Sequence, residues 1–364
     1  MKQYCSRLGI LALALVCLSP ARGSTEYALI KANPAAKTLY MNPAWSPDGR
    51  SIAYVAITNA EKLDYAIISH PTSIRLATLR NGKWAHKLLV SKGHSPVWSA
   101  NGTLAFARNG LLIMDLHTGH VKRLSNDRLS RIPREDDATA YQDIPISFSP
   151  DGRYLAYNRL LWEEAEIRVF DMKLNRDLGI NVGNRFAWSR DSRRMLTSFE
   201  WYGDQQVPSR LVMWDLSRAK WRSILKGYRV DDIVWPKGRD YAWVLIQDVL
   251  DEGPDTDLKP PNGAGIYRLD LTKHTLTKLS DITSWILPSP TYERFAFAGK
   301  RPDATGEREI YVGETGKWQF RLIARHFPGP GNWSQRARFM GWSPDGQSLA
   351  YVTGQGDIRI VKFP

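Results

Sequence analysis

Residues 45–50 read WSPDGR and residues 342–347 read WSPDGQ, so nearly the same hexapeptide stands near both ends of the 364-residue chain. Ser-Pro-Asp-Gly is a tight-turn sequence, because proline presets φ at the second position and glycine adopts the left-handed conformation that closes a hairpin. Each copy is followed by a short run, SIAYV at 51–55 and SLAYV at 348–352, that is apolar on both faces and has a small alanine at its centre. Such runs predict strands that neighbouring layers cover on both sides.

The hexapeptide belongs to a repeat that runs along the chain. Related turns follow Trp98, Phe148, Trp188 and Trp235, and a degraded copy begins at Pro288, which makes seven copies spaced 40 to 54 residues apart. Each copy continues with a third strand and usually a fourth, as in LVMWDL at 211–216 followed by KWRSIL at 220–225. Four antiparallel strands in a repeat of this length predict the blade of a β-propeller.

The two ends of the chain predict how the ring closes. The last repeat stops at its third strand, 358–363, whereas YALIK at 27–31 precedes the first repeat as a spare strand. We therefore predict an all-β fold, a seven-bladed β-propeller of four-stranded antiparallel blades, closed by the N-terminal strand pairing with the last blade. Closure removes exposed sheet edges, and residues 24–364 form a single domain in this prediction.

Residues 1–23 have the pattern of a secretory signal peptide. Lys2 and Arg7 precede an apolar run at 8–18, and small residues at 21 and 23 suit cleavage before Ser24. A buried N-terminal helix is one alternative, and a lipoprotein signal ending at Cys17 is another. No later segment is long and apolar enough to cross a membrane. We expect a periplasmic protein, with secretion as the alternative.

Cysteine usage and charge narrow the function classes. Cys5 and Cys17 both lie inside the expected signal, so the mature chain would have no disulfide, thiol nucleophile or cysteine-ligated metal. The formal net charge of +13 favours an acidic partner or an anionic surface. Because the charge is spread along the chain without a long Lys/Arg block, we expect no nucleic-acid partner.

The repeat resembles the TolB-like propeller repeat, from about residue 27 to the C-terminus. Similar blades occur in TolB, in prolyl-oligopeptidase-type peptidases and in oligogalacturonate lyases. TolB has an additional N-terminal α/β domain, for which few residues remain here, and the G-x-S-x-G elbow of the peptidases is absent. The resemblance to the lyases implies a metal-dependent group with clustered histidines, but only His117 and His120 lie close in sequence here. The WD-repeat family is more remote and is matched once, at Trp214-Asp215.

A propeller of this kind has two different rims. One, called the turn rim below, carries the Ser-Pro-Asp-Gly turns and the turns between third and fourth strands. The other, called the loop-rich rim, carries the longer segments near 59–73, 125–144, 200–206, 248–265 and 325–338, and loops on a rigid scaffold often carry function. The candidate partner-binding residues expected there are Asp136, Asp137, Tyr141, Trp162, Trp201, Tyr202, Asp204, Trp285, Trp333 and Arg336.

Each candidate also has a structural interpretation. The acidic residues suit a solvated loop as well as a cation or a basic partner, and the tryptophans suit packing between blades as well as anchoring of a protein or a sugar. The repeat tryptophans, such as Trp45, are predicted to be structural. Acidic residues between 248 and 257 do not have EF-hand spacing, and no metal ligands, cofactor or catalytic residues are assigned.

Two functions remain open from the sequence. The first is a monomeric, non-catalytic exported module that binds an acidic protein or cell-envelope polymer through the loop-rich rim. The second is a hydrolase or lyase acting on an anionic saccharide or small molecule in the central channel. If the protein is an enzyme, titratable groups with shifted pKa values should lie together at the mouth of the channel. Their presence or absence there would distinguish the two functions.

Overall fold

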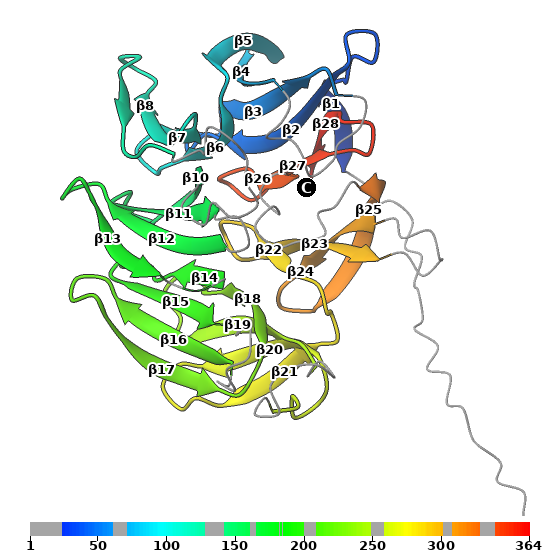
Figure 1. Ribbon diagram of the computed structural model, residues 1–364. Helices are drawn as coiled ribbons and strands as arrows, with labels where there is room; N and C mark the ends of the chain where they lie inside the picture. The colour runs from blue at the N-terminus through cyan, green and yellow to red at the C-terminus, as the bar shows by residue number, and fades with distance from the viewer. Residues whose placement is uncertain are drawn as a thin grey trace, which may run out of the picture.

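The computed structural model describes residues 24–60, 71–127, 142–160, 165–181, 183, 185–199, 209–248, 258–300, 308–327 and 339–364. Within these ranges the chain forms seven four-stranded antiparallel sheets. The sheets follow one another in chain order around a ring, from blue to red in Figure 1. The predicted seven-bladed β-propeller is therefore confirmed.

Each blade begins at the central axis and its strands proceed outward in chain order, except that the outermost strand of the seventh blade is the first strand of the chain. The first two blades consist of β2 (Thr38–Trp45), β3 (Ser51–Thr58), β4 (Thr72–Arg80) and β5 (Lys83–Ser91), then β6 (His94–Trp98), β7 (Thr103–Ala107), β8 (Leu111–Asp115) and β9 (Val121–Arg123). The third and fourth consist of β10 (Gln142–Phe148), β11 (Tyr154–Leu160), β12 (Ala165–Asp171) and β13 (Arg176–Asn181), then β14 (Arg185–Trp188), β15 (Arg194–Phe199), β16 (Arg210–Asp215) and β17 (Lys220–Lys226).

The remaining blades follow the same order. The fifth and sixth consist of β18 (Val230–Val234), β19 (Tyr241–Ile246), β20 (Gly265–Asp270) and β21 (Leu276–Ser280), then β22 (Ile286–Pro288), β23 (Arg294–Lys300), β24 (Arg308–Glu314) and β25 (Gln319–Phe327). The seventh consists of β26 (Met340–Trp342), β27 (Ser348–Val352), β28 (Ile358–Lys362) and, from the other end of the chain, β1 (Thr25–Ile30).

The N-terminal strand closes the ring as the sequence predicts. β1 pairs antiparallel with β28, with Tyr27 opposite Ile360, and Figure 1 shows blue β1 beside red β28. Glu26 accepts hydrogen bonds from the Tyr351 hydroxyl (2.6 Å) and the Arg359 guanidinium (2.9 Å). The closing strand is thus held by its backbone hydrogen bonds to β28 and by the two hydrogen bonds that the Glu26 carboxylate accepts.

The repeated hexapeptide is a self-contained hydrogen-bonded turn. In the first copy the Ser46 hydroxyl donates to Asp48 (2.5 Å), the Arg50 amide donates to the same carboxylate (3.0 Å), and the Ser51 amide donates to the Ser46 oxygen (2.9 Å). Gly49 has φ of 68°, the left-handed conformation that the turn requires. The same bonds recur at Ser149/Asp151, Ser189/Asp191 and Ser343/Asp345.

Four of the five repeat tryptophans bond to the preceding blade, whereas Trp235 bonds to the Arg239 carbonyl of its own blade (3.1 Å), so all five have a structural role. The indole N–H of Trp98 donates to the Ala44 carbonyl (2.9 Å), and that of Trp342 donates to the Leu287 carbonyl (2.9 Å). Trp45 in the first blade donates to Gly341 in the seventh (3.1 Å). The two nearly identical hexapeptides therefore lie in neighbouring blades.

The core lies between the blades. The second strands are the most buried, and the alanines at their centres are 0% exposed at positions 53, 105, 156, 242, 296 and 350. These small side chains let adjacent sheets approach closely, while large side chains such as Tyr54 and Tyr157 fill the space beside them. Within the described ranges, no helix has the length and apolar composition needed to span a bilayer.

The turn carboxylates link stability to pH. The hydrogen bond from Ser46 lowers the pKa of Asp48 below its ordinary value of 3.8. Burial acts to raise the pKa of Asp151, Asp191 and Asp345, but the serine and backbone hydrogen bonds outweigh it, so each pKa is again lowered. A carboxyl group with a lowered folded pKa contributes stability above its unfolded pKa, and this contribution is lost as the pH falls through the folded pKa.

We therefore expect the Tm to fall as the pH is lowered below about 4. The fall should be shallower in a variant with asparagine at all four turn positions, Asp48, Asp151, Asp191 and Asp345, because asparagine does not titrate. Differential scanning calorimetry between pH 5 and pH 2 measures both slopes. Equal slopes for the two proteins would show that these turns do not set the acid sensitivity.

Candidate functional site on the loop-rich rim

Charged and polar side chains mark the beginnings of four consecutive inner strands. The first residues of β6, β10, β14 and β18 reach the loop-rich rim, and they place His94, Asp143, Arg185 and Asp231 there. The rest of each inner strand is largely apolar and leads to the turn rim. The loop-rich end of the central axis is therefore the polar end of blades two to five.

The most buried charge in this group is the carboxylate of Asp143, which is 0% exposed. Arg159, its cross-strand neighbour on β11, donates to both carboxylate oxygens, through Nε at 2.8 Å and Nη2 at 2.9 Å. The Ser125 hydroxyl adds a third bond at 2.8 Å. The Arg159 side chain is 19% exposed, so this pair connects the interior of blade three to the surface of the rim.

Asp127 is a second carboxyl group beside this pair. One of its oxygens accepts a hydrogen bond from the Asp143 backbone amide at 2.8 Å. Burial, supported by the nearby negative charge of Asp143, raises the pKa of Asp127 to about 6, against the lowering effects of backbone hydrogen bonds and of Arg123. Asp127 therefore changes its protonation state near neutral pH. A titratable group of this kind is what an enzyme active site was expected to contain.

Blades two and five add further members to the polar end. His94 lies 3.5 Å from the amide nitrogen of Gln142, and its other ring nitrogen lies 3.1 Å from the Ser95 hydroxyl. In blade five, Asp231 accepts from Arg229 at 3.2 Å through its side chain and from Arg185 of blade four at 2.9 Å through its backbone carbonyl. Arginine side chains thus stand beside acidic residues along this rim.

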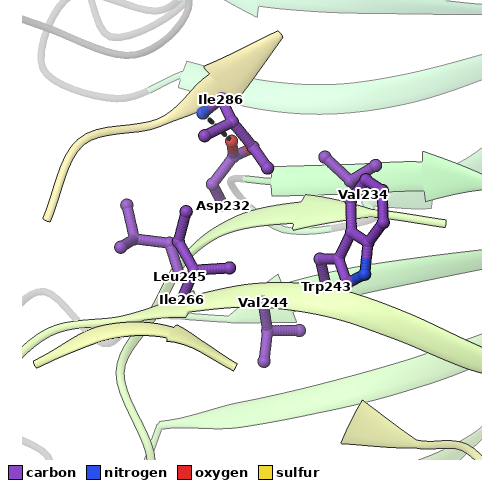
Figure 2. Close-up of a pocket in the computed structure, with 7 residues that line it drawn as sticks. All are labelled: Asp232, Val234, Trp243, Val244, Leu245, Ile266 and Ile286. Carbon is purple, nitrogen blue, oxygen red and sulfur yellow. Dashed lines mark hydrogen bonds between the residues drawn. The ribbon is translucent and has the colours of Figure 1, made fainter. Parts of the chain in front are cut away.

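Asp232 has a different role. It is 2% exposed and lines a small pocket between blades five and six with Val234, Trp243, Val244, Leu245, Ile266 and Ile286 (Figure 2). Its two oxygens accept from the backbone amides of Ile233 (2.9 Å) and Ile286 (3.1 Å). This carboxylate joins two blades within an apolar surrounding, and we interpret it as structural.

Most of the candidate residues expected from the sequence lie outside the described residues. These are Asp136, Asp137, Tyr141, Trp162, Trp201, Tyr202, Asp204, Trp333 and Arg336. Trp285 is described, is 4% exposed and belongs to the core cluster shared by blades one, six and seven. For Trp285 the alternative interpretation, packing between blades, is the one that its surroundings support.

Asp127, Asp143 and Arg159 are not among the candidate residues expected from the sequence. The available signal was a charged residue at the start of an inner strand, in QDIPISF, and another at the end of a second strand, in YLAYNRL. Among the described residues, no group of three or more His, Cys, Asp or Glu side chains is placed to hold a metal ion. The acidic segment at 249–257 lies outside the described residues.

The protonation of Asp127 can be observed directly. A carbon NMR titration of its side-chain carboxyl should give a midpoint near pH 6, because burial and the Asp143 charge both favour the neutral form. In an Asp143→Asn variant the midpoint should fall, since one of the two causes is removed. A midpoint near 4 in the unmodified protein would contradict this description of the site.

The comparisons with known proteins agree with the fold. No protein-family model and no curated protein matches the chain. An oligogalacturonate lyase solved with manganese matches with a TM-score of 0.62 and 13% identity over 94% of this chain and 96% of that chain. The oligogalacturonate lyase from Vibrio parahaemolyticus matches with a TM-score of 0.63 and 11% identity over 94% and 97%.

TolB from Acinetobacter baumannii is also similar, with a TM-score of 0.42 and 16% identity over 82% of this chain and 63% of that chain. The seven four-stranded blades, three of which carry Ser-Pro-Asp-Gly turns, are the features on which the resemblance to the TolB-like propeller repeat rests. At such low identities, the lyase structures establish the shared propeller fold alone.

Proposed function

We propose that this protein is an exported propeller that binds an acidic ligand, a protein or an envelope polymer, at the loop-rich rim of blades two to five. The observation that carries the proposal is the bidentate Asp143–Arg159 pair with Asp127 beside it. Such a pair holds a guanidinium in one orientation at the surface. A fixed guanidinium is well suited to recognise carboxylate or phosphate groups.

The ligand is expected to be acidic because arginines recur along this rim. Arg123, Arg185 and Arg229 lie on the same end of blades two, four and five as Arg159 does on blade three. The net charge of +13 would also draw an acidic ligand toward the protein.

Catalysis at the same place is the second candidate function, and one observation favours it. Asp127 has a pKa of about 6, which suits a general acid or base at neutral pH. The similar structures include two oligogalacturonate lyases, so an anionic saccharide is the substrate class to examine. In that case Asp127 would be the group that takes up or releases the proton.

The binding proposal can be tested by calorimetric titration with oligogalacturonate, using a neutral maltooligosaccharide of equal length for comparison. We expect binding of the acidic chain only, weakened about tenfold or more by Arg123→Gln, since one charged hydrogen-bond donor is lost. Arg80→Gln, an exposed arginine on the turn rim, is the matched control and should bind normally. Equal binding of both saccharides, or of neither, would contradict the proposal.

The same samples distinguish binding from catalysis. If unsaturated product accumulates in the unmodified protein and disappears in Asp127→Asn while binding remains, the second candidate is correct. If binding occurs without product, the non-catalytic module is correct.

Export is tested separately, by cell fractionation and N-terminal sequencing. A periplasmic protein that begins at Ser24 supports export and the domain limits 24–364, whereas a cytoplasmic protein that begins at Met1 contradicts both.

A further inference from the structure

On the turn rim of blades three to five, aspartate carboxylates accept hydrogen bonds from residues of their own turns. In the inner turns, Asp151 and Asp191 accept from serine hydroxyls at 2.6 and 2.5 Å and from backbone amides at 2.9 and 3.1 Å. In the outer turns, Asp171 and Asp270 each accept from the amides two and three residues later. These hydrogen bonds stabilise the turns, and the carboxylates of Asp151 and Asp191 remain exposed at the turn tips.

The basic residues of the same turns are also exposed, and they outnumber the exposed acids. Turn tips of successive blades end on one rim, so their side chains face the same direction. The exposed basic side chains on this part of the rim, called the basic arc below, are Lys173, Arg176, Arg190, Arg193, Arg194, Arg218, Lys220, Lys237, Arg239 and Lys273.

The rest of the turn rim is balanced in charge. Its exposed bases include Arg50, Arg80, Lys83 and Lys317, and exposed acids such as Asp48, Glu293, Glu314 and Asp345 stand among them. In the basic arc, ten exposed bases stand among three exposed acids, Asp151, Asp191 and Asp240. The basic arc therefore gives the ring one strongly positive sector on the face opposite the loop-rich rim. Within the arc, the ion pairs Arg194–Asp191 and Arg218–Asp215 are exposed and 3.7 Å long, so they neutralise little of it.

Two further features lie within the arc. A hollow of about 470 Å³ opens between blades three and four, lined by Asp151, Arg153, Tyr154, Asp191, Ser192, Arg193 and Ser217. Leu174, at the tip of the turn between β12 and β13, is 51% exposed and stands beside Lys173. An exposed apolar side chain beside basic ones is typical of surfaces that rest on a membrane.

We propose that the basic arc docks on a bilayer surface rich in anionic phospholipids. The bases are spread over turn tips of three blades and do not follow a groove, which suits a flat anionic surface better than a single polyanion chain. Each lysine or arginine near such a surface contributes attraction that salt screens. Leu174 reaches the headgroup region, and the hollow beside Arg193 accommodates a headgroup. Docked in this way, the protein presents its loop-rich rim to the solvent, whichever function that rim has.

The test is vesicle co-sedimentation of the chain from Ser24, with phosphatidylcholine vesicles containing about one third phosphatidylglycerol or none. We expect binding to the anionic vesicles alone, and weaker binding as salt is raised. A fourfold variant, Lys173→Gln, Arg176→Gln, Arg190→Gln and Arg193→Gln, should bind about a thousandfold more weakly. Leu174→Ser should bind more weakly than the unmodified protein at high salt, where charge is screened.

The matched control removes the same charge from the balanced part of the rim, with Arg50→Gln, Arg80→Gln, Lys83→Gln and Lys317→Gln. It should retain vesicle binding. Equal losses in both fourfold variants would mean that net charge alone acts, and would overturn the proposal. Absence of binding to anionic vesicles, or stronger binding of the arc to soluble dextran sulfate than to vesicles, would also overturn it. All substituted residues are exposed, and unchanged melting curves confirm that both variants are folded.

Discussion

Replacing Arg159 with glutamine is expected to lower the free energy of unfolding by about 3–5 kcal/mol. The substitution leaves the carboxylate of Asp143, which is 0% exposed, without either of its guanidinium hydrogen bonds at 2.8 and 2.9 Å. An uncompensated buried charge is among the most destabilising changes that a point substitution can make. Urea denaturation of the two proteins measures the difference.

A second substitution separates the buried charge from the loss of packing. Adding Asp143→Asn to Arg159→Gln removes the unpaired charge, and we expect it to recover most of the lost stability. An amide in this position can still accept the Ser125 hydrogen bond. If Arg159→Gln alone costs less than about 1 kcal/mol, the pair is not the buried link that we describe.

Removal of β1 is expected to have the other large effect. A chain that begins at Lys31 lacks Leu29, which is 5% exposed, and leaves the outer edge of β28 and the Tyr351 hydroxyl without their partners. We expect a loss of at least about 5 kcal/mol, because one buried leucine alone is worth about 2–5 kcal/mol. An open edge strand should also promote aggregation.

Two controls locate the cause. A chain that begins at Ser24 keeps β1 and should unfold like the full-length protein. Glu26→Ala keeps the strand but removes the carboxylate that binds Tyr351 and Arg359, and it should cost about 1–3 kcal/mol. Thermal unfolding with light-scattering detection compares them. A chain from Lys31 that melts at the unmodified temperature would show that β1 does not hold the ring closed.

The fold could be predicted because its local signals agree with one another. Each turn carries its own hydrogen-bonding serine and aspartate, as at Ser46 and Asp48, so the sequence of one turn specifies one hairpin. In four repeats the tryptophan then bonds to the preceding blade, as Trp98 does to Ala44. A missing fourth strand at one end and a spare strand at the other left one way to close the ring.

The candidate site could not be predicted in the same way, because a bulge displaces its register. Counting back from the hairpin turn, where Phe148 pairs with Leu155, a regular ladder would place Ile144 opposite Arg159. The register shifts between Pro145 and Ser147, and Asp143 takes that place. A one-residue slip moves every side chain to the other face, so the sequence alone hides this pair.

The candidate partner-binding residues were expected in the loops because irregular segments often carry function. Nine of the ten candidates chosen in this way fall outside the described residues, and they remain predictions. Asp127 lies at the end of a described range, next to one of these segments.

If the loop-rich rim of blades two to five receives an acidic ligand, as we propose, the ligand should protect backbone amides there. Amide hydrogen exchange measured with and without oligogalacturonate detects this protection. We predict slower exchange at the beginnings of β6, β10, β14 and β18 and at the end of β11, with unchanged exchange at the Ser-Pro-Asp-Gly turns. Protection confined to the turn rim, or no protection at any saccharide concentration, would contradict the account.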